Sequence, residues 1–280
     1  MANLEEIKVM DSQGNFEFIK ADLRNPEEID KIVADHDFFG IVNLAAMAGV
    51  RVSIDDPVLY VDVNLNGTVN LLKSAHKHKV ENFVLASTSS AYGDTDIIPF
   101  VETDPSDRPL APYATSKRAA EMMAYTYHHL FDISATCLRF FTVYGPRGRP
   151  DMMAYKVLDN IFFDTPCKLY NAGEMWRDWT FVSDIVHGVA NAAERKLGYE
   201  IINLGRGEMV KLADFITIIE ELTGRKSNLE NAPKIDADID RSFADVSKAR
   251  KLLDYDPKVS VPEGIQKFWE WYESSVLKSV

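Results

Sequence analysis

The sequence is poor in cysteine. Only Cys137 and Cys167 occur among its 280 residues, far apart and with no Cys-x-x-Cys pair. A disulfide framework needs several cysteines, and a structural zinc site needs closely spaced cysteine or histidine ligands. The six histidines offer no such spacing, because no His-Glu-x-x-His sequence is present. We therefore expect no disulfide and no metal site, with both cysteines acting as buried apolar side chains.

The sequence also lacks an excess of positive charge. Lys and Arg number 31 against 43 Asp and Glu, a formal net charge of −12 that is spread along the chain. A basic face for nucleic acid or anionic lipid is therefore not indicated. No run approaches the roughly 18 apolar residues that span a bilayer, and residues 1–14 lack the apolar core of a secretion signal. We expect a cytoplasmic protein with no nucleic-acid or membrane partner.

What the chain does contain is an alternation of short apolar runs with helical patterns. The runs are partly β-branched and predict strands at residues 16–19, 41–45, 83–86, 135–141 and 201–204. Helices are predicted from Pro26, from Pro57 to about residue 78, and at 114–130, 182–195, 211–222 and 262–272. This order predicts an α/β protein with a doubly wound, mostly parallel sheet, whose ligands bind beyond the carboxyl ends of the strands.

A stretch rich in proline and glycine at residues 144–150 marks the predicted domain boundary, because no regular element continues through it. We assign residues 1–143, with about 178–205, to the sheet domain. Residues 144–177 and 206–280 are assigned to a smaller, interleaved C-terminal lobe.

Two groups of polar residues could carry chemistry. Tyr113 and Lys117 lie four apart near the start of a helical pattern, so both project from one face, and the ammonium can favour the phenolate. Such a spacing also arises by chance. Four consecutive hydroxyl residues, at 87–90, directly follow the predicted strand 83–86, where a ligand would sit. An ordinary polar loop is the alternative for that cluster.

Three segments in order resemble the extended short-chain dehydrogenase/reductases that modify nucleotide sugars. They are ASTSSAYG at 86–93, PYATSK at 112–117 and LRFFTVYGP at 138–146. The resemblance runs from about Phe16 to Trp271 and implies a Rossmann-like fold, NAD as cofactor and a UDP-sugar substrate. RPDM at 149–152 and RDWTFV at 177–182 look most like UDP-glucuronate 4-epimerases.

The resemblance also implies roles for individual residues. Tyr113 would be the acid/base, assisted by Lys117. Thr88 would form a hydrogen bond to the reacting oxygen, and Ser89 is the alternative residue for that contact. Related dehydratases and decarboxylases carry an acidic residue where this chain has Ser90. The lack of an acid there favours redox inversion of the sugar carbon over elimination or decarboxylation. The implied contacts to NAD are Asp22, Leu23, Ala45, Ala46, Met47, Asn64, Tyr113 and Lys117.

On the substrate side, the resemblance assigns Arg177 to the diphosphate, and pairing with Asp178 at the surface is the alternative. Arg149 and Thr142 would face the glucuronate carboxylate, unless Arg149 only bonds loop carbonyls. Asp238 matches the position near the uridine ribose.

One family feature is absent. Family members begin with a strand, a Gly-x-x-Gly-x-x-Gly turn and a helix, and none of the 14 glycines here forms such a turn. We therefore expect weak or no NAD binding by this chain. The strand at 16–19 would move inward beside 41–45, or another chain would fill the gap, because an open apolar edge invites pairing.

Two hypotheses follow from the resemblance. The first is an NAD-dependent UDP-sugar 4-epimerase that converts UDP-glucuronate to UDP-galacturonate through a 4-keto intermediate. The second is a UDP-sugar-binding or assembly subunit without redox activity. The helices at 57–78 and 114–130 resemble the pair that forms a four-helix interface in such epimerases, which predicts a homodimer.

Overall fold

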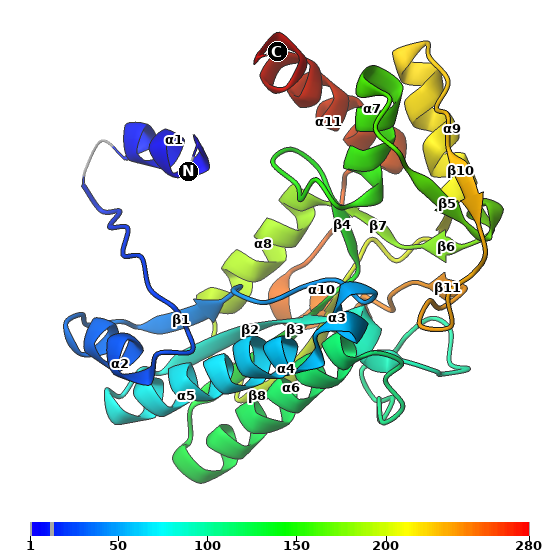
Figure 1. The fold of residues 1–280 in the computed structure, drawn as a ribbon. Coiled ribbons are helices and arrows are strands. Elements are labelled where there is room, and N and C mark those ends of the chain that lie inside the picture. The colour runs from blue at the N-terminus through cyan, green and yellow to red at the C-terminus, as the bar shows by residue number, and fades with distance from the viewer. Residues whose placement is uncertain (1, 12–13, 280) are drawn as a thin grey trace.

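A parallel sheet forms the centre of the computed structural model, which describes residues 2–11 and 14–279. Its four strands are β1 (Gly40–Asn43), β2 (Asn82–Thr88), β3 (Ser134–Phe140) and β8 (Tyr199–Leu204), in the order β1-β2-β3-β8. All three pairings are parallel (Figure 1). The predicted α/β class is confirmed, and the ends of these four strands lie within two residues of the predicted ends.

Helices cover both faces of this sheet. One face is covered by α2 (Pro26–Ala34), α5 (Gly67–Lys77) and α6 (Pro112–Phe131), and the other by α8 (Val182–Ala193) and α10 (Ser247–Leu253). Leu72 and Ala120 pack against Phe83 on the first side, and Ile185 packs with Leu138 on the second. Strands β2 and β3 are almost wholly buried between these layers.

The helix predicted at 57–78 is present as three consecutive segments. They are α4 (Pro57–Tyr60), a π-helical stretch (Val61–Asn66) and α5. Asp56 starts the first by accepting a hydrogen bond from the backbone N–H of Leu59. Gly67 allows close packing, because a Cβ at this position would lie 2.8 Å from the Cβ of Leu23.

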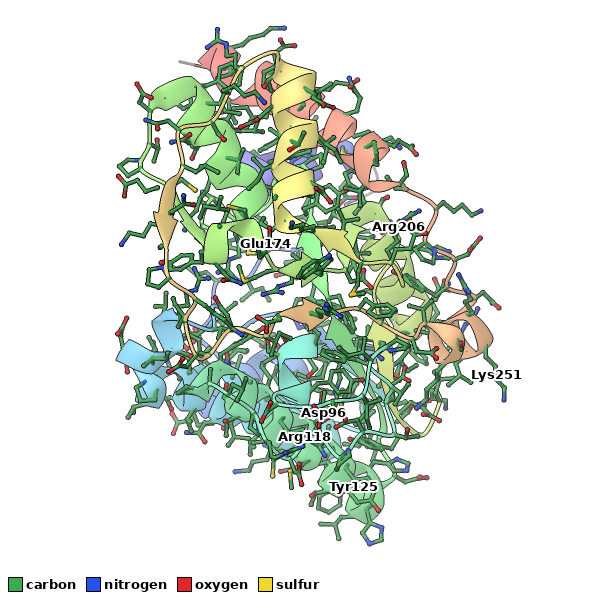
Figure 2. The ribbon with its side chains drawn as sticks, turned by 90° about the vertical axis from the view of Figure 1, so that its right-hand side faces the viewer. Asp96, Arg118, Tyr125, Glu174, Arg206 and Lys251 are labelled. Atoms are coloured by element: carbon green, nitrogen blue, oxygen red, sulfur yellow. The ribbon has the colours of Figure 1, made fainter. Side chains whose placement is uncertain are left out.

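A second lobe is built from the C-terminal half of the chain. Its helices are α7 (Met153–Phe163), α9 (Leu212–Thr223) and α11 (Val261–Ser275). Short strands join them in three small sheets: β4 (Thr142–Tyr144) with β7 (Trp179–Phe181), β5 (Lys168–Tyr170) with β10 (Glu230–Ala232), and β6 (Trp176–Arg177) between β9 (Val210–Lys211) and β11 (Arg241–Ser242). In Figure 2 this lobe lies above α6, which carries Arg118 and Tyr125.

The predicted strand at residues 16–19 is wrong. This segment is extended but belongs to no sheet, and Phe16, Phe18 and Ile19 are 36%, 44% and 41% exposed. It does not move inward beside β1, whose single partner among the described residues is β2. An apolar run forms a strand only where a neighbouring strand accepts its hydrogen bonds.

The remaining segments are short. A helix, α1 (Ala2–Met10), lies near the start, and α3 (Val52–Asp55) follows the loop after β1. Both cysteines are buried and unpaired, as predicted. Among the described residues, no helix has both the length and the apolar character needed to cross a membrane, and no cluster of three metal-ligating side chains is found.

Candidate active site

The predicted catalytic residues lie where β2 ends and α6 begins. Thr88 is the last residue of β2, and Tyr113 follows the proline at the first position of α6, where its fixed φ favours helix initiation. Thr88 and Tyr113 line the same pocket, and the Thr88 hydroxyl is close enough to lower the pKa of Tyr113. Lys117 lies one turn further along α6 and is 2% exposed. The structure therefore brings these three residues together.

Burial dominates the electrostatics of this group. It raises the pKa of Tyr113 above its ordinary value, against the opposing effects of the Thr88 hydrogen bond and the Arg149 charge. Burial also lowers the pKa of Lys117 to about 8, because the ammonium loses its hydration. Arg149 is thus the cation that favours the Tyr113 phenolate here, whereas the sequence points to Lys117. The charged neighbour of Lys117 is instead Glu121, on the inner side of α6.

The four consecutive hydroxyl residues do not act as one cluster. Ser87 lies within β2 and turns into the core, where its hydroxyl donates to Glu121. Thr88, Ser89 and Ser90 line a pocket, and the Thr88 hydroxyl also accepts the backbone N–H of Ser90 at 3.1 Å. The cluster therefore divides between a structural and a pocket-facing part.

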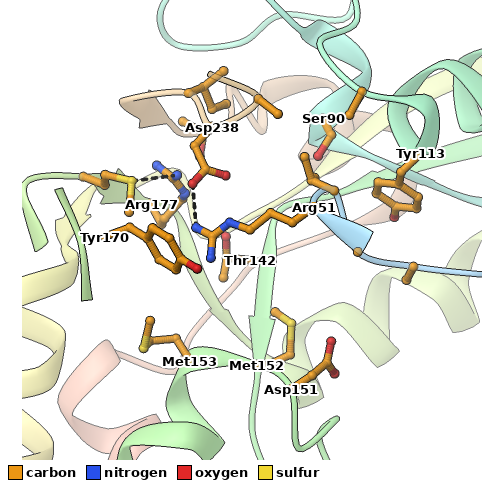
Figure 3. Close-up of a pocket in the computed structure, with 18 of the residues that line it drawn as sticks. Arg51, Ser90, Tyr113, Thr142, Asp151, Met152, Met153, Tyr170, Arg177 and Asp238 are labelled. Carbon is orange, nitrogen blue, oxygen red and sulfur yellow. Dashed lines mark hydrogen bonds and ion pairs between the residues drawn. The ribbon is translucent and has the colours of Figure 1, made fainter. Parts of the chain in front are cut away.

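This pocket has a volume of about 770 Å³ and lies between the sheet domain and the second lobe (Figure 3). Its lining includes every substrate-side residue implied by the resemblance: Ser89, Thr142, Arg149, Arg177 and Asp238. Residues 144–177 and 206–280 supply much of the far wall. A pocket of this size at the carboxyl end of parallel strands is where ligands bind in such folds.

Arg149 is held by neighbours within its own loop. Its Nε donates to Asp151 at 2.9 Å, a second ion pair joins the same two side chains, and its Nη2 lies 3.5 Å from the carbonyl oxygen of Ala48. The alternative in which Arg149 bonds a loop carbonyl is therefore also present. The carboxylate of Asp151 keeps the guanidinium at the pocket, where a ligand carboxylate could replace it.

Arg177 is partly buried in the wall of the pocket and does not pair with Asp178. Its Nη1 donates to the carbonyl oxygens of Trp176 and Asp240 at 2.9 and 3.3 Å, and burial lowers its pKa. Asp178 is fully buried and accepts hydrogen bonds from backbone N–H groups, including those of Arg206 at 2.6 Å and Gly207 at 2.9 Å. The alternative of a surface ion pair between residues 177 and 178 is therefore wrong.

Arg51 was missed by the sequence reasoning. It forms an ion pair with Asp238 at 2.5 Å, and its guanidinium stacks on the ring of Tyr170 at 3.7 Å from the centroid (Figure 3). The pair connects the loop after β1 to the second lobe across the pocket. The available signal was its place in that loop, just after a predicted strand end.

On the cofactor side, Ala45, Ala46 and Met47 continue from the carboxyl end of β1. Asn64 binds the backbone of Met47 with both atoms of its amide, at 2.8 and 2.9 Å, and also donates to Ser116 at 2.9 Å. Its side chain therefore fixes this loop to α6.

Asp22 and Leu23 form the outer part of the same wall. Two nitrogens of Arg24 donate to the exposed carboxylate of Asp22, which lowers its pKa to about 2. Leu23 packs against Gly67 and accepts a hydrogen bond from Asn70 on its backbone carbonyl at 2.8 Å.

These residues fit NAD in part. Tyr113 and Lys117, which the resemblance assigns to the nicotinamide ribose, lie one turn apart on α6, and the loop after β1 is held to the same helix through Asn64 and Ser116. Binding a diphosphate also calls for a glycine-rich turn with free backbone N–H groups. Gly14 is the only glycine before Gly40 in the sequence, so the chain supplies no such turn ahead of β1.

Comparison with known proteins agrees with this geometry. The family model described as GDP-mannose 4,6 dehydratase matches residues 1–268. The UDP-glucuronate 4-epimerase of Thermodesulfobacterium geofontis is 40% identical over 269 residues, which cover 95% of this chain and 83% of that protein. The probable UDP-glucuronate 4-epimerase of Rhizobium meliloti is 35% identical over 290 residues, covering 97% and 85%.

Solved structures give the same result. The UDP-glucuronic acid 4-epimerase from Bacillus cereus, in complex with UDP-glucuronic acid and NAD, aligns with a TM-score of 0.87 at 32% identity, covering 98% of this chain and 87% of that one. The UDP-glucose 4-epimerase of Thermotoga maritima aligns with a TM-score of 0.89 at 27% identity, covering 96% and 88%.

The fold, the Thr88, Tyr113 and Lys117 group and these relatives define an extended short-chain dehydrogenase/reductase, a class of enzyme for which NAD is the cofactor. The chain belongs to the family described by the GDP-mannose 4,6 dehydratase model, and its relatives place it among the nucleotide-sugar epimerases.

Proposed function

We propose that the chain catalyses 4-epimerisation of a UDP-sugar, and that this sugar is UDP-glucuronate, which becomes UDP-galacturonate. The observation that carries the proposal is a single pocket lined by Thr88 and Tyr113 and also by three guanidinium groups, those of Arg51, Arg149 and Arg177. A diphosphate and a sugar carboxylate are both anions that guanidinium groups bind in a bidentate manner. The pocket therefore offers cations for both ends of this substrate.

The chemistry of the chain's own residues follows from their positions. Tyr113, as phenolate, takes the proton from the sugar 4-hydroxyl and returns it after the sugar has turned in the pocket. The Thr88 hydroxyl donates to the reacting oxygen or accepts from it, so it holds that oxygen in both protonation states. Bound NAD supplies the acceptor and donor of the C4 hydride. The 4-keto sugar is transient, and no net oxidation results.

Specificity in this proposal rests on Arg149 and Thr142. Arg149 would exchange its Asp151 partner for the glucuronate carboxylate, with the Thr142 hydroxyl beside it. Ser90 lines the pocket at the position where dehydratases carry an acid, so this chain has no acid there for elimination. Arg177 would bind the diphosphate, and Asp238 the ribose of the uridine.

The direct test is to incubate the chain with UDP-glucuronate and millimolar NAD and to follow the sugar by proton NMR. UDP-galacturonate is the expected product. A pentose product would indicate decarboxylation and contradict the proposal.

A second candidate is a UDP-sugar-binding or assembly subunit without redox activity. Three guanidinium groups line the pocket and would bind the anionic groups of a UDP-sugar whether or not hydride transfer follows. Calorimetric titration with UDP and UDP-glucuronate separates the two candidates when combined with the NMR assay. Affinity without turnover at saturating NAD supports the subunit, and the absence of UDP binding excludes both functions.

The proposal includes a homodimer formed through the π-helical stretch, α4 and α6. Val58, Val61 and Met122 are 76%, 40% and 57% exposed on these neighbouring helices. A second copy placed against them would bury this apolar surface. Light scattering at micromolar concentration should give the mass of a dimer, and the mass of a monomer would contradict it.

A further inference from the structure

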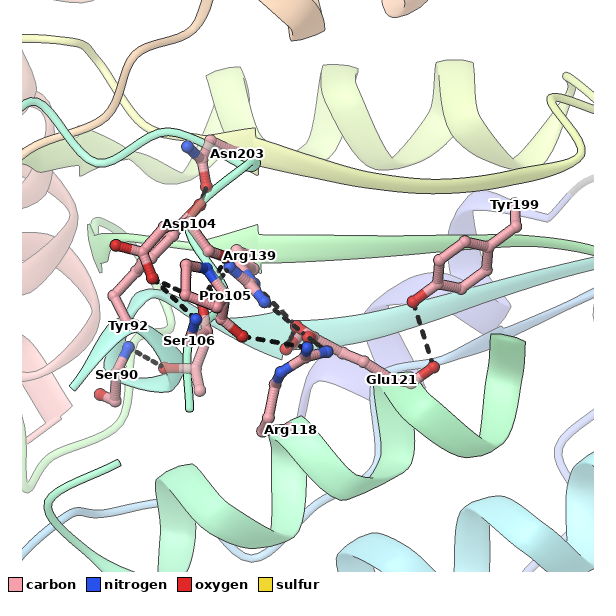
Figure 4. Close-up of polar contacts among 12 residues, drawn as sticks. Ser90, Tyr92, Asp104, Pro105, Ser106, Arg118, Glu121, Arg139, Tyr199 and Asn203 are labelled. Carbon is pink, nitrogen blue, oxygen red and sulfur yellow. Dashed lines mark hydrogen bonds and ion pairs between the residues drawn. The ribbon is translucent and has the colours of Figure 1, made fainter. Parts of the chain in front are cut away.

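Behind the catalytic group lies a buried ionic network that the proposed chemistry does not use (Figure 4). Its centre is Glu121, which is fully buried on α6, four residues after Lys117. Oε1 of Glu121 accepts from Ser87 at 2.5 Å and from Nε of Arg139 at 2.9 Å. Oε2 accepts from Arg139 at 2.7 Å and from Arg118 at 3.1 Å. Both oxygens of the carboxylate are therefore bonded.

The network continues from Arg139 toward the opposite side of the sheet. Arg139 is fully buried on β3, donates to the Ser106 hydroxyl at 2.9 Å, and lies over the Tyr92 ring at 4.4 Å from the centroid. The Tyr92 hydroxyl donates to Asn203 on β8 at 2.7 Å. Hydrogen bonds thus connect α6 with β2, β3 and the segment after β2, and the ring contact with Tyr92 extends the network to β8.

These contacts hold together β2, which carries Thr88, and α6, which carries Tyr113. Ser87 directly precedes Thr88 on β2, and Glu121 lies two turns after Tyr113 on α6. The bond from Ser87 to Glu121 therefore ties together β2 and α6, the two elements that place Thr88 and Tyr113 in the same pocket. A buried ion pair adds little net stability compared with apolar residues of similar volume, because removing its charges from water is costly. Holding α6 and β2 in one arrangement therefore explains the network better than stability does.

We propose that Glu121, together with Ser87 and Arg139, is a positioning residue that holds Thr88 beside Tyr113 in the pocket. It touches neither substrate nor cofactor. The inference rests on the proposed function for its purpose, but its geometry can be tested without turnover. A displacement of about 1 Å at a reacting group can lower a rate by about a hundredfold, so a tie of this kind matters to catalysis.

The test uses 3-fluorotyrosine placed at position 113 of the whole chain, read by fluorine NMR without substrate. The fluorine lies next to the phenol oxygen, so its resonance reports whether the Thr88 hydroxyl lies beside that oxygen. Thr88→Val gives the reference shift for loss of that hydroxyl. Ser87→Ala removes only the tie to β2 and leaves the pair of Glu121 with Arg139. We expect Ser87→Ala and Glu121→Gln to move the resonance at least half of the way to that reference.

A matched control separates positioning from general loss of stability. Ile219→Val lies in the core of the second lobe and should lower the melting temperature without moving the resonance. An unchanged resonance in Ser87→Ala would overturn the proposal, even if Glu121→Gln fails to fold. An unchanged resonance in Thr88→Val would also overturn it, because the contact to be positioned would be absent. Neither result depends on whether UDP-glucuronate is turned over.

Discussion

The substrate pocket and the outer edge of β1 differ in how far their groups are paired. In the pocket, Arg51 is paired with Asp238 and Arg149 with Asp151, so the cations are held in place before any ligand arrives. At the edge of β1, Val42 and Leu44 are 39% and 56% exposed. The comparison indicates that the pocket holds its charged groups in place before a ligand binds, whereas the outer edge of β1 leaves apolar side chains exposed.

Tyr113→Phe should break the chemistry while leaving the pocket intact. It removes only the hydroxyl that transfers the proton, so turnover should fall by about a hundredfold to ten-thousandfold. Affinity for UDP-glucuronate should stay within a few fold. Rates come from NMR at millimolar NAD and affinities from calorimetry. Tyr125→Phe, exposed on the same helix, is the control, and a Tyr113→Phe variant that keeps most of its rate would show that Tyr113 is not the acid/base.

NAD affinity tests the other side of the comparison. A glycine-rich turn and a helix N-terminus supply charge-assisted hydrogen bonds worth roughly 1.5 to 3 kcal/mol each and a dipole term of roughly 0.3 to 1 kcal/mol. Without two or three of them, affinity should fall by about a thousandfold, into the millimolar range. Absorbance and mass spectrometry of the purified chain should find little NAD. Near-stoichiometric NAD would show that another segment or chain supplies the phosphate site.

Arg177→Met should weaken the pocket without affecting the edge of β1. Losing a guanidinium that binds a diphosphate costs roughly 1.5 to 3 kcal/mol, which is about a tenfold to hundredfold loss of UDP affinity. Calorimetry with UDP measures the change. Arg225→Met is the matched control because Arg225 is exposed and lies outside the pocket. Equal affinities in both variants would remove Arg177 from the diphosphate site.

Lys117→Met tests the cost of burying a charge, and we expect it to raise the free energy of unfolding. The pKa of Lys117 in the folded chain, about 8, lies below its ordinary value of 10.5. Between these values the unfolded chain binds more protons, so the parent gains stability as pH rises through that window. At pH 7, below both values, the variant should be more stable by about 3 kcal/mol.

Urea unfolding at pH 7 and pH 10 checks the Lys117 prediction. The stability difference between Lys117→Met and the parent should narrow at the higher pH. Lys251→Met, exposed on α10, should show no such dependence. A variant less stable than the parent at pH 7 would show that Lys117 makes favourable contacts that outweigh the cost of its burial.

Much of the fold could be predicted because each element carries a local signal. The cap at Asp56, the proline at residue 57 and the apolar periodicity identified the helix at 57–78. The segment at 16–19 had the same kind of apolar signal as β1 but no neighbour to pair with. Pairing is a tertiary property, so this error could not be found from the run itself.

The site divides in a similar way. Thr88, Tyr113 and Arg177 stood in recognisable segments, and the structure brings all three to one pocket or its border. Arg51 and Glu121 were missed because each depends on a partner far away in the sequence, at Asp238 and Arg139 respectively. A charged residue in a helical pattern normally predicts a solvent-exposed face, and nothing local marks Glu121 as buried.

The most direct test of the account is the fate of deuterium in UDP-glucuronate labelled at C4. The chain is incubated with this substrate and saturating NAD, and the product is followed by NMR. The account predicts UDP-galacturonate that retains deuterium at C4, because the same hydride leaves and returns. Loss of the label to solvent, or a product other than UDP-galacturonate, would contradict it.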